Sequence, residues 1–351
     1  MSHRQLPGCI CSGWWEADHV QGAALDACRQ YVYFSFTDIL VKATLDGQIV
    51  GTVTGLVGHM GCLAYCPQDG RLYASLEYKR DQIGRSILER LGQQSLETDG
   101  FYIAIFDVEK INRLGMDAER DGIMTCVHLS EVLADYEARW VDSNGQSRSH
   151  RYGCSGIDGL TFAPVFGQRG EKDFLYVAYG IYSDLSREDN DCQVLLRYDI
   201  RSWRQYERPL RQGSLHRSGP SRPEEKIFLH TGNTTYGIQN LEYDSYTGTL
   251  LAAVYPGKKA QYPNHSFFTF DLTRPLQKKE TEEPEGMCQS GRELDDPGIA
   301  GWESSLGATG LIALGDGSYY LSEPSQQGKK YSSRLLLHRW TGRQPCPFAP
   351  Q

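Results

Sequence analysis

Short apolar runs with alternating polar positions recur along this chain, and they predict strands rather than helices. The clearest group predicts four strands, at 21–28, 31–36, 39–45 and 48–53. Asp46-Gly47 separates the third strand from the fourth, and this dipeptide suits the tight turn of an antiparallel hairpin. Helical spacing is scarce, which disfavours folds that need a helix between successive strands.

One order of strand-like runs occurs five times. The copies begin at His19, His59, Gly156, Gly237 and Gly307. In each copy a second run follows, in which Tyr or Leu stands two residues before a small residue. A third run ends in an apolar residue and Asp in four copies, at Asp46, Asp107, Asp199 and Asp271. We interpret these aspartates as turn residues that bond their own backbone, and the repeat as a radial or linear array.

This order of strands resembles the β-propeller superfamily, with blades similar to the NHL and YVTN types, over residues 8–342. The resemblance implies an all-β, five-bladed propeller of four-stranded antiparallel blades. The expected blades span about 19–55, 59–131, 156–212, 237–282 and 307–342 within a single domain, 1–351. Six blades are the alternative, with the extra unit hidden between 129 and 152.

The last copy stops after its third strand, which would leave an unpaired sheet edge. Such an edge is a liability because it can pair with other chains. Residues 8–15 precede the first copy and are free to supply the missing outer strand. We therefore expect the N-terminal segment to close the last blade and lock the ring.

Long connections fall mainly on one end of the expected ring. They join the second run to the third at 79–100, 183–192, 256–264 and 324–333, and one blade to the next at 132–155, 213–236 and 281–306. Both kinds of connection emerge on the same face of a propeller, and the segment after Asp107 is the main exception. Loops this long are uncommon unless they are functional or disordered. We therefore predict that this face is the working face.

Two of these connections carry a helical pattern. Ile83, Ile87, Leu88 and Leu91 recur at helical spacing, and Gly92 is placed to end that helix. Ser130 could cap a second helix with an apolar side formed by residues 132–136. The apolar stripes of both helices are expected to be buried against the ring.

Polar residues stand where the first runs begin and where the second runs end, next to the central channel at the working face. The first runs contribute His19, Gln21, His59, Asp158, Gln239, Asn240 and Thr309; the second runs contribute Asp38, Glu77, Asp184 and Glu323. Such groups around one axis could hold a divalent cation of the calcium kind or bond a polyol. The alternative for each residue is a solvating or structural role, because channels hold water in any case.

Three of these residues are the candidates for catalysis: Glu77, Asp158 and His59. Paired carboxylates can divide acid and base roles when their environments differ, and burial would raise the pKa of Glu77. Trp302 precedes the last copy and is a candidate platform for stacking a sugar. The remaining residues of the set are candidates for ligand binding.

Two functions stay open. The first is binding of a small polar, sugar-like ligand at the channel mouth, with metal-assisted hydrolysis, or lyase chemistry on a carbohydrate or lactone-like substrate, if the protein is an enzyme. The second is a non-catalytic scaffold that holds another protein with its long loops. No His-Glu-x-x-His, Gly-x-Ser-x-Gly or Gly-Lys-Ser/Thr motif occurs. The polar residues at the channel mouth are largely titratable rather than apolar, which favours the first function.

Composition narrows the partners and the location. The net charge is −8, and basic residues are scattered, which disfavours nucleic acid. No apolar run reaches the roughly 20 residues of a membrane helix, and no signal peptide is visible. The expected location is the cytoplasm, although a secreted chain shortened at its N-terminus would look the same. The ten cysteines form no Cys-x-x-Cys pair and are expected to be free, mostly buried thiols.

Overall fold

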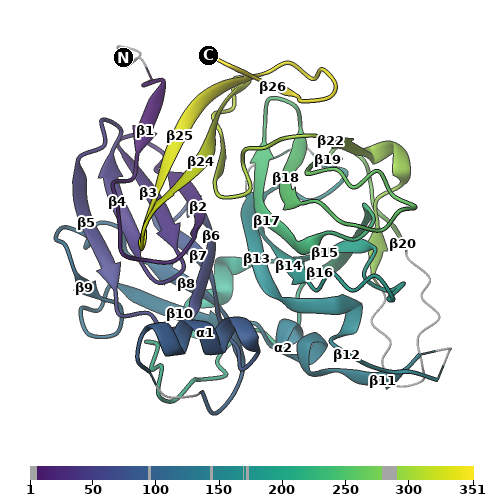
Figure 1. Ribbon diagram of the computed structural model, residues 1–351, viewed down its shortest axis with the longest axis horizontal. Coiled ribbons are helices and arrows are strands. Elements are labelled where there is room, and N and C mark those ends of the chain that lie inside the picture. The colour runs from purple at the N-terminus through teal and green to yellow at the C-terminus, as the bar shows by residue number, and fades with distance from the viewer. Residues whose placement is uncertain (1–5, 94–95, 143–144, 169, 171–173, 279–290) are drawn as a thin grey trace.

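The strands form five small sheets arranged in a ring, as Figure 1 shows in a computed structural model. The structure describes residues 6–93, 96–142, 145–168, 170, 174–278 and 291–351. The protein is a five-bladed β-propeller. This confirms the predicted fold class in its five-bladed form.

Blade 1 follows the sequence pattern closely. Its strands are β2 (Val20–Leu25), β3 (Tyr31–Phe36), β4 (Leu40–Thr44) and β5 (Ile49–Thr54), paired in that order. Gly47 has a φ of +82°, the left-handed conformation that the turn between β4 and β5 requires. A short strand from the following blade, β9 (Met116–Asp117), adds to β5 in parallel.

The next three blades are built in the same way around the axis. Blade 2 contains β6 (His59–Cys66), β7 (Arg71–Tyr78), β8 (Gly100–Phe106) and β10 (Met124–His128). Blade 3 contains β13 (Cys154–Ala163), β14 (Phe174–Ile181), β15 (Cys192–Tyr198) and β16 (Glu225–His230), with β21 (Arg292–Glu293) and β20 (Gln277–Lys278) at its edge. Blade 4 contains β17 (Thr235–Asp244), β18 (Thr249–Tyr255), β19 (Phe267–Asp271) and β22 (Ile299–Trp302).

The two ends of the chain meet in blade 5, where the purple and yellow ribbons lie side by side in Figure 1. Its own strands are β23 (Leu311–Ala313), β24 (Ser318–Gln327), β25 (Lys330–Trp340) and β26 (Phe348–Pro350). The N-terminal strand β1 (Cys9–Cys11) pairs antiparallel with β25, with Ile10 opposite Leu335. The predicted closure by the N-terminal segment is confirmed.

A backbone clamp next to β1 gives a test of this closure. Ser12 is buried; its Oγ accepts a hydrogen bond from the Ser333 backbone N–H at 2.8 Å, and its own N–H donates to the Ser333 carbonyl. Ser12→Ala should lower the free energy of unfolding by about 1–3 kcal/mol, because the Ser333 N–H stays buried without a partner. Urea denaturation measures it, with Cys9→Ser on the exposed face of β1 as control. Equal stability of the two variants would show that the clamp does not hold the ring.

The core lies between neighbouring blades rather than within them. Alternate residues of each strand face the adjacent blade, so aromatic and branched side chains from two sheets interdigitate. Between blades 2 and 3, for example, the rings of Tyr73 and Phe162 meet edge to face with centroids 5.1 Å apart. These contacts fix where each inner strand stands relative to the axis.

The predicted confinement of insertions to one face is wrong. Strand β16 lies inside the segment that we assigned to a connection between blades, and β22 does the same in blade 4. The long segments 199–224 and 272–298 therefore join third strands to fourth strands, like the segment 107–123. Such connections emerge on the face opposite the predicted working face. The insertions are thus divided between both faces.

Two α-helices lie on the predicted working face. Helix α1 (Gln82–Arg90) starts at Asp81, whose side chain caps Gly84 N–H, and Gly92 follows its end with a φ of +64°, as predicted. Helix α2 (Ser130–Glu137) begins one residue earlier than a cap at Ser130 would allow, because Leu129 is the capping residue and Ser130 is already helical. No helix among the described residues has the length and apolar character needed to cross a bilayer.

The segment suggested as a hidden sixth blade has another structure. After α2 it forms a small separate hairpin of β11 (Arg139–Val141) and β12 (Ser147–Ser149). The chain then enters β13 through a short 3₁₀ turn, Arg151–Gly153. Two short strands do not make a blade, so the ring closes with five.

Candidate functional site

The inner strands of the first four blades are all irregular near their starts. Their register with the second strand shifts between Val20 and Gly22, Met60 and Leu63, Ile157 and Leu160, and Ile238 and Asn240. A bulge leaves residues out of the ladder and changes the direction of their side chains. The residues left out include Gln21, Asp158 and Gln239, which share one column of the repeat. All three line the same cavity.

That cavity has a volume of about 410 Å³ and lies at the end of the ring where the inner strands begin. Six of the predicted site residues line it: His19, Gln21, His59, Glu77, Asp158 and Gln239. Blades 1 to 4 and helix α1 all contribute to the lining. The convergence that we expected from the repeat therefore holds for this group.

An ion pair between Glu77 and Lys79 lies at the floor of the cavity. The two residues are two positions apart at the end of β7, so their side chains point to the same side. Lys79 Nζ lies 2.5 Å from Glu77 Oε1 and donates to the Ser155 carbonyl at 2.8 Å. The side chains are only 3% and 4% exposed. Both charges are therefore removed from water, and each depends on the other for compensation.

Blade 3 holds the second oxygen of Glu77. The Ile157 backbone N–H donates to Oε2 at 3.1 Å. The preceding residue is Gly156, with a φ of +131°, and a Cβ there would lie 1.9 Å from that oxygen. Only glycine therefore lets the backbone of blade 3 approach the carboxylate. This accounts for the glycine at position 156 of the repeat.

Electrostatics keeps both members of the pair charged. Burial alone would raise the pKa of Glu77, but the charges of Lys79 and His59 lower it below its ordinary value. We predicted a raised pKa from burial, and that prediction is wrong because it left Lys79 out. Burial would lower the pKa of Lys79, whereas the nearby carboxylates, Glu77 first, raise it above its ordinary value. Glu77 is therefore a carboxylate and Lys79 an ammonium at neutral pH.

Asp158 is shifted in the opposite direction. Burial, and then repulsion by the Glu77 charge, raises the pKa of Asp158 to about 6. Gln239 Nε2 donates to Asp158 Oδ2 at 3.2 Å. Near pH 6 Glu77 is thus ionised while Asp158 exchanges a proton. Two carboxylates whose environments separate their pKa values can act as different partners in proton transfer.

The two predicted histidines have different surroundings. His59 Nδ1 lies 3.5 Å from Glu77 Oε1, and this buried nitrogen makes no hydrogen bond to any part of the chain that the structure describes. His19 lies at the rim with its side chain 69% exposed, edge-on to the Tyr331 ring at 5.3 Å. Only His59 reaches the floor, where its Nδ1 lies next to the Glu77 carboxylate.

The walls above the floor are less polar. Ile83 and Ile87 of helix α1 line one part, and Tyr236 and Tyr255 of blade 4 line another. The two tyrosines are 46% and 39% exposed, which is unusual for large side chains. A few polar groups at the base of partly apolar walls are typical of small-molecule sites.

Asp38 and Glu323 lie outside the cavity lining, each in an ion pair. Asp38 Oδ2 is 2.9 Å from Arg90 Nη1 at the end of α1, so it helps to hold the helix over the ring. Glu323 pairs with Arg334 across the exposed hairpin of β24 and β25. Both strand ends reach the working face as expected, but neither side chain turns toward the floor.

Thr309 and Trp302 also lie outside the cavity lining. Thr309 is buried within blade 5, where its Oγ1 lies 2.8 Å from Ser322 Oγ. We placed Trp302 in a loop beside an inner strand, but it belongs to β22, the outermost strand of blade 4, and packs against Trp340 at 5.7 Å. It is far from the axis because the last strand of a blade lies at the rim of the ring.

Asn240 crosses the channel below the cavity. Its Nδ2 donates to the carbonyls of Gln21 at 2.8 Å and Ala308 at 2.9 Å, and its Oδ1 accepts from Cys62 Sγ at 3.5 Å. One amide of blade 4 is therefore bonded to blades 1, 2 and 5. It forms part of the base that separates the two ends of the channel.

The described residues show no group of three or more His, Cys, Asp or Glu side chains that could hold a metal ion. The calcium-like cation that the carboxylates suggested has no ligand set there. Lys79 lies against Glu77 instead, so a fixed ammonium supplies the positive charge at the floor.

Several lining residues were missed by the sequence reasoning. Asp18, Ser155 and Tyr236 each come immediately before a repeat copy begins, so they share a column that could have been found. Lys79 was treated as the start of a loop, although it follows Glu77 at the two-residue spacing of a strand face. Tyr255 ends β18, the equivalent of the strand ends that we did inspect in other blades.

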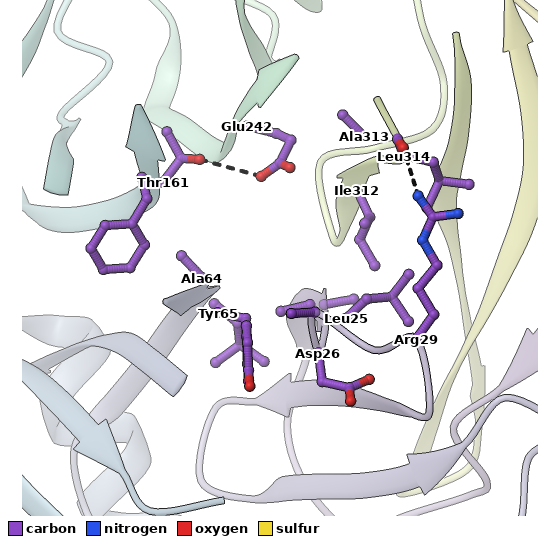
Figure 2. A pocket seen from close by; sticks show the side chains of 15 residues that line it. Leu25, Asp26, Arg29, Ala64, Tyr65, Thr161, Glu242, Ile312, Ala313 and Leu314 are labelled. Carbon is purple, nitrogen blue, oxygen red and sulfur yellow. Dashed lines mark hydrogen bonds between the residues drawn. The ribbon is translucent and has the colours of Figure 1, made fainter. Parts of the chain in front are cut away.

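A second, smaller cavity of about 210 Å³ lies at the other end of the channel. Figure 2 shows its lining, to which the far ends of all five inner strands contribute. The Thr161 hydroxyl donates to Glu242 there at 3.3 Å, and Arg29 donates to the Leu314 carbonyl at 2.7 Å (Figure 2). The rest of the lining is mainly small and apolar, without a buried charged pair like that of the first cavity.

No family model and no curated protein matches this chain. Solved structures match it with low identity. One is a functionally unknown protein from Desulfotomaculum acetoxidans, with 11% identity over 95% of this chain and 69% of that chain and a TM-score of 0.35. Another is the calcium structure of Trichoderma reesei Carbohydrate-Active Enzymes Family AA12, with 11% identity over 89% of this chain and 80% of that chain and a TM-score of 0.40. A third is the Neurospora crassa Pan2 WD40 domain, with 7% identity over 88% of this chain and 72% of that chain and a TM-score of 0.32. Likeness at this level says nothing of activity.

Proposed function

We propose that the cavity at the start of the inner strands binds a small, polar, sugar-like ligand. The observation that carries the proposal is the floor of the cavity, where blades 2 and 3 bring together the charged pair of Glu77 and Lys79 and the carboxyl of Asp158. Burying such groups costs stability, and strongly perturbed titratable groups in a cleft are typical of functional sites.

The lining suggests which part of the ligand faces which group. Asp158, Gln239 and the His59 ring offer hydrogen bonds to hydroxyl groups at the floor. Tyr236 and Tyr255 offer ring faces above them. A ring with polar edges and apolar faces, as in a sugar or a sugar lactone, satisfies both demands.

If the site is catalytic, we propose that Asp158 transfers the proton. Its pKa of about 6 lets it act as acid or base close to neutral pH. Lys79 stays positively charged and can stabilise negative charge that develops on an oxygen of the substrate. Glu77 holds Lys79 in position. Hydrolysis or elimination on a carbohydrate or lactone-like substrate needs these parts, with Lys79 in the role that we first gave to a metal.

A thermal-shift screen of neutral sugars, sugar acids and sugar lactones tests this proposal. Ser86 lies on α1 and lines the cavity, so Ser86→Trp would fill it, whereas Ser86→Ala leaves it open. A ligand at ten times its Kd should add about 1.4 kcal/mol to the stability of the natural protein and of Ser86→Ala. Ser86→Trp should show no such gain. A screen without any hit, or equal gains in all three proteins, would contradict the proposal.

The scaffold alternative also has an observation in its favour. Asn240 bonds across the channel to other blades, as in a propeller with a filled channel, and Leu185 in a loop at the cavity end is 56% exposed. A failed screen together with a partner whose binding Leu185→Ser weakens would favour this function. The narrower likeness to NHL- and YVTN-type blades, and a cytoplasmic location without nucleic-acid or membrane partners, stay predictions.

A further inference from the structure

Two thiols lie side by side on the strand that closes the ring. Cys9 and Cys11 are both exposed on β1, while Ile10 between them is buried. Residues two apart on a strand point to the same side, and the two Sγ atoms are 4.0 Å apart. This departs from our prediction of mostly buried thiols, because four of the nine free cysteines that the structure describes are exposed.

We propose that Cys9 and Cys11 together bind one soft, thiophilic cation of the Cu(I) class. The spacing of the sulfurs carries the proposal. Metal–thiolate bonds are about 2.3 Å long, as for zinc, so one ion bonded to two sulfurs 4.0 Å apart would subtend an angle of about 120°. That angle suits a low-coordinate ion whose remaining position is open to a small thiol or to water. Strand β1, which carries both cysteines, does not have to change its conformation.

The donor set selects the ion. Thiolates favour Cu(I), zinc and iron–sulfur clusters over calcium or magnesium. Structural zinc is almost always bound by four ligands, and iron–sulfur clusters by four cysteines. No third His, Cys, Asp or Glu completes such a group among the described residues. Two protein sulfurs at this angle therefore fit a three-coordinate Cu(I) that takes its third ligand from solution.

The charges around the two thiols include one cation, Arg334, which is itself paired with Glu323. Binding releases the two thiol protons to solvent, and a Cu(I) ion with two thiolates carries one net negative charge. Arg334 lies opposite Cys11 on the neighbouring strand β25, so one positive side chain stands next to the site. Exposure of both thiols gives the ion direct access from solvent.

Binding at this site would be coupled to closure of the ring. Strand β1 pairs with β25 and supplies the N-terminal edge of blade 5. An ion that binds the folded strand stabilises the folded state according to its concentration and affinity. At a free ion concentration 100 times the Kd, the gain is at most about 2.7 kcal/mol, because two cysteines so close in sequence also bind the ion in the unfolded chain.

An anaerobic titration with Cu(I) in the presence of a chromophoric Cu(I) chelator tests the proposal. The natural protein should withdraw one Cu(I) per chain from the chelator, and X-ray absorption should show sulfur neighbours. Cys9→Ser and Cys11→Ser should each weaken binding at least 100-fold, since each removes one of two donors. The matched control is Cys28→Ser/Cys346→Ser, which removes two other exposed thiols and should bind as the natural protein does.

Two results would overturn the site. One is a natural protein that takes no copper from the chelator. The other is a pair of single variants that bind as tightly as the control, which would place the ion elsewhere. Because both thiols are exposed, the serine variants should keep the circular dichroism spectrum of the natural protein, so a loss of binding reports the site rather than unfolding.

Discussion

Asp158→Asn should make the protein more stable above pH 6, although it removes a candidate functional group. The folded state raises the pKa of Asp158 to about 6 from an ordinary value of 3.8. Only well below pH 3.8 is the carboxyl protonated in both the folded and the unfolded state, so that its raised pKa has no effect on stability there. As the pH rises through this window the unfolded chain loses the proton more easily, so folding becomes less favourable. A rise of the Asp158 pKa from 3.8 to about 6 lowers the free energy of unfolding at high pH by about 3 kcal/mol.

Asparagine removes this cost and keeps the shape of the side chain. It can still accept the hydrogen bond from Gln239. Urea denaturation at pH 4 and at pH 8 measures the effect, with a gain of about 2–3 kcal/mol expected only at pH 8. Asp184→Asn is the control, because Asp184 lies in an exposed loop and its pKa is lowered by bonds from Ser186, although burial opposes this. An Asp158→Asn variant with no gain at pH 8 would refute the raised pKa.

Glu77→Ala should have the opposite effect and lower the free energy of unfolding by about 3–5 kcal/mol, because removing one partner leaves the other as an unpaired buried charge. Lys79 would keep the Ser155 carbonyl at 2.8 Å and Asp81 at 3.8 Å, but no carboxylate in direct contact among the described residues. The Ile157 N–H would also lose its acceptor. Chemical denaturation at pH 7 measures the loss.

The double variant Glu77→Ala/Lys79→Met tells the pair from general damage to the cavity. Removing both charges should recover part of the loss, so the two substitutions should be non-additive by at least 1 kcal/mol or so. Glu323→Ala is the matched control, since it breaks an exposed pair that contributes about 0–1 kcal/mol. Additive losses from the two substitutions would show that Glu77 and Lys79 do not depend on each other.

The buried charges of this site lower the stability of the folded protein. Stable folds rarely place an unprotonated Asp beside a second buried carboxylate, and strained or destabilising groups persist mainly where function needs them. The same reasoning applies to Tyr236, which has a φ of +66° at the cavity wall. Natural proteins lose stability at such positions in exchange for activity.

The repeat made the architecture predictable. Strand order, the Asp46-Gly47 hairpin and the pairing of the N-terminal segment with β25 all follow from local patterns and from the need to cover a sheet edge. The fourth strands of blades 3 and 4 were not predictable in this way. Each follows a connection of more than 20 residues, so nothing local links Phe228 or Ile299 to its neighbouring strand.

The site was predictable in part for the same reason. Asp158 and Gln239 share a repeat column, and a column in a ring of blades points to one axis. The column does not say which way a side chain turns, so Thr309 was grouped with them although it lies inside blade 5. The repeat column also does not show that Lys79 forms an ion pair with Glu77. That pair lowers the pKa of Glu77, whereas we expected it to be raised.

The structure of the complex with the best ligand from the screen tests the central claim most directly. The account predicts that the ligand lies between helix α1 and Tyr236, with a polar atom within hydrogen-bonding distance of Asp158 or Lys79. A ligand bound in the opposite cavity of Figure 2, or among the outer loops with the floor of the first cavity untouched, would contradict it.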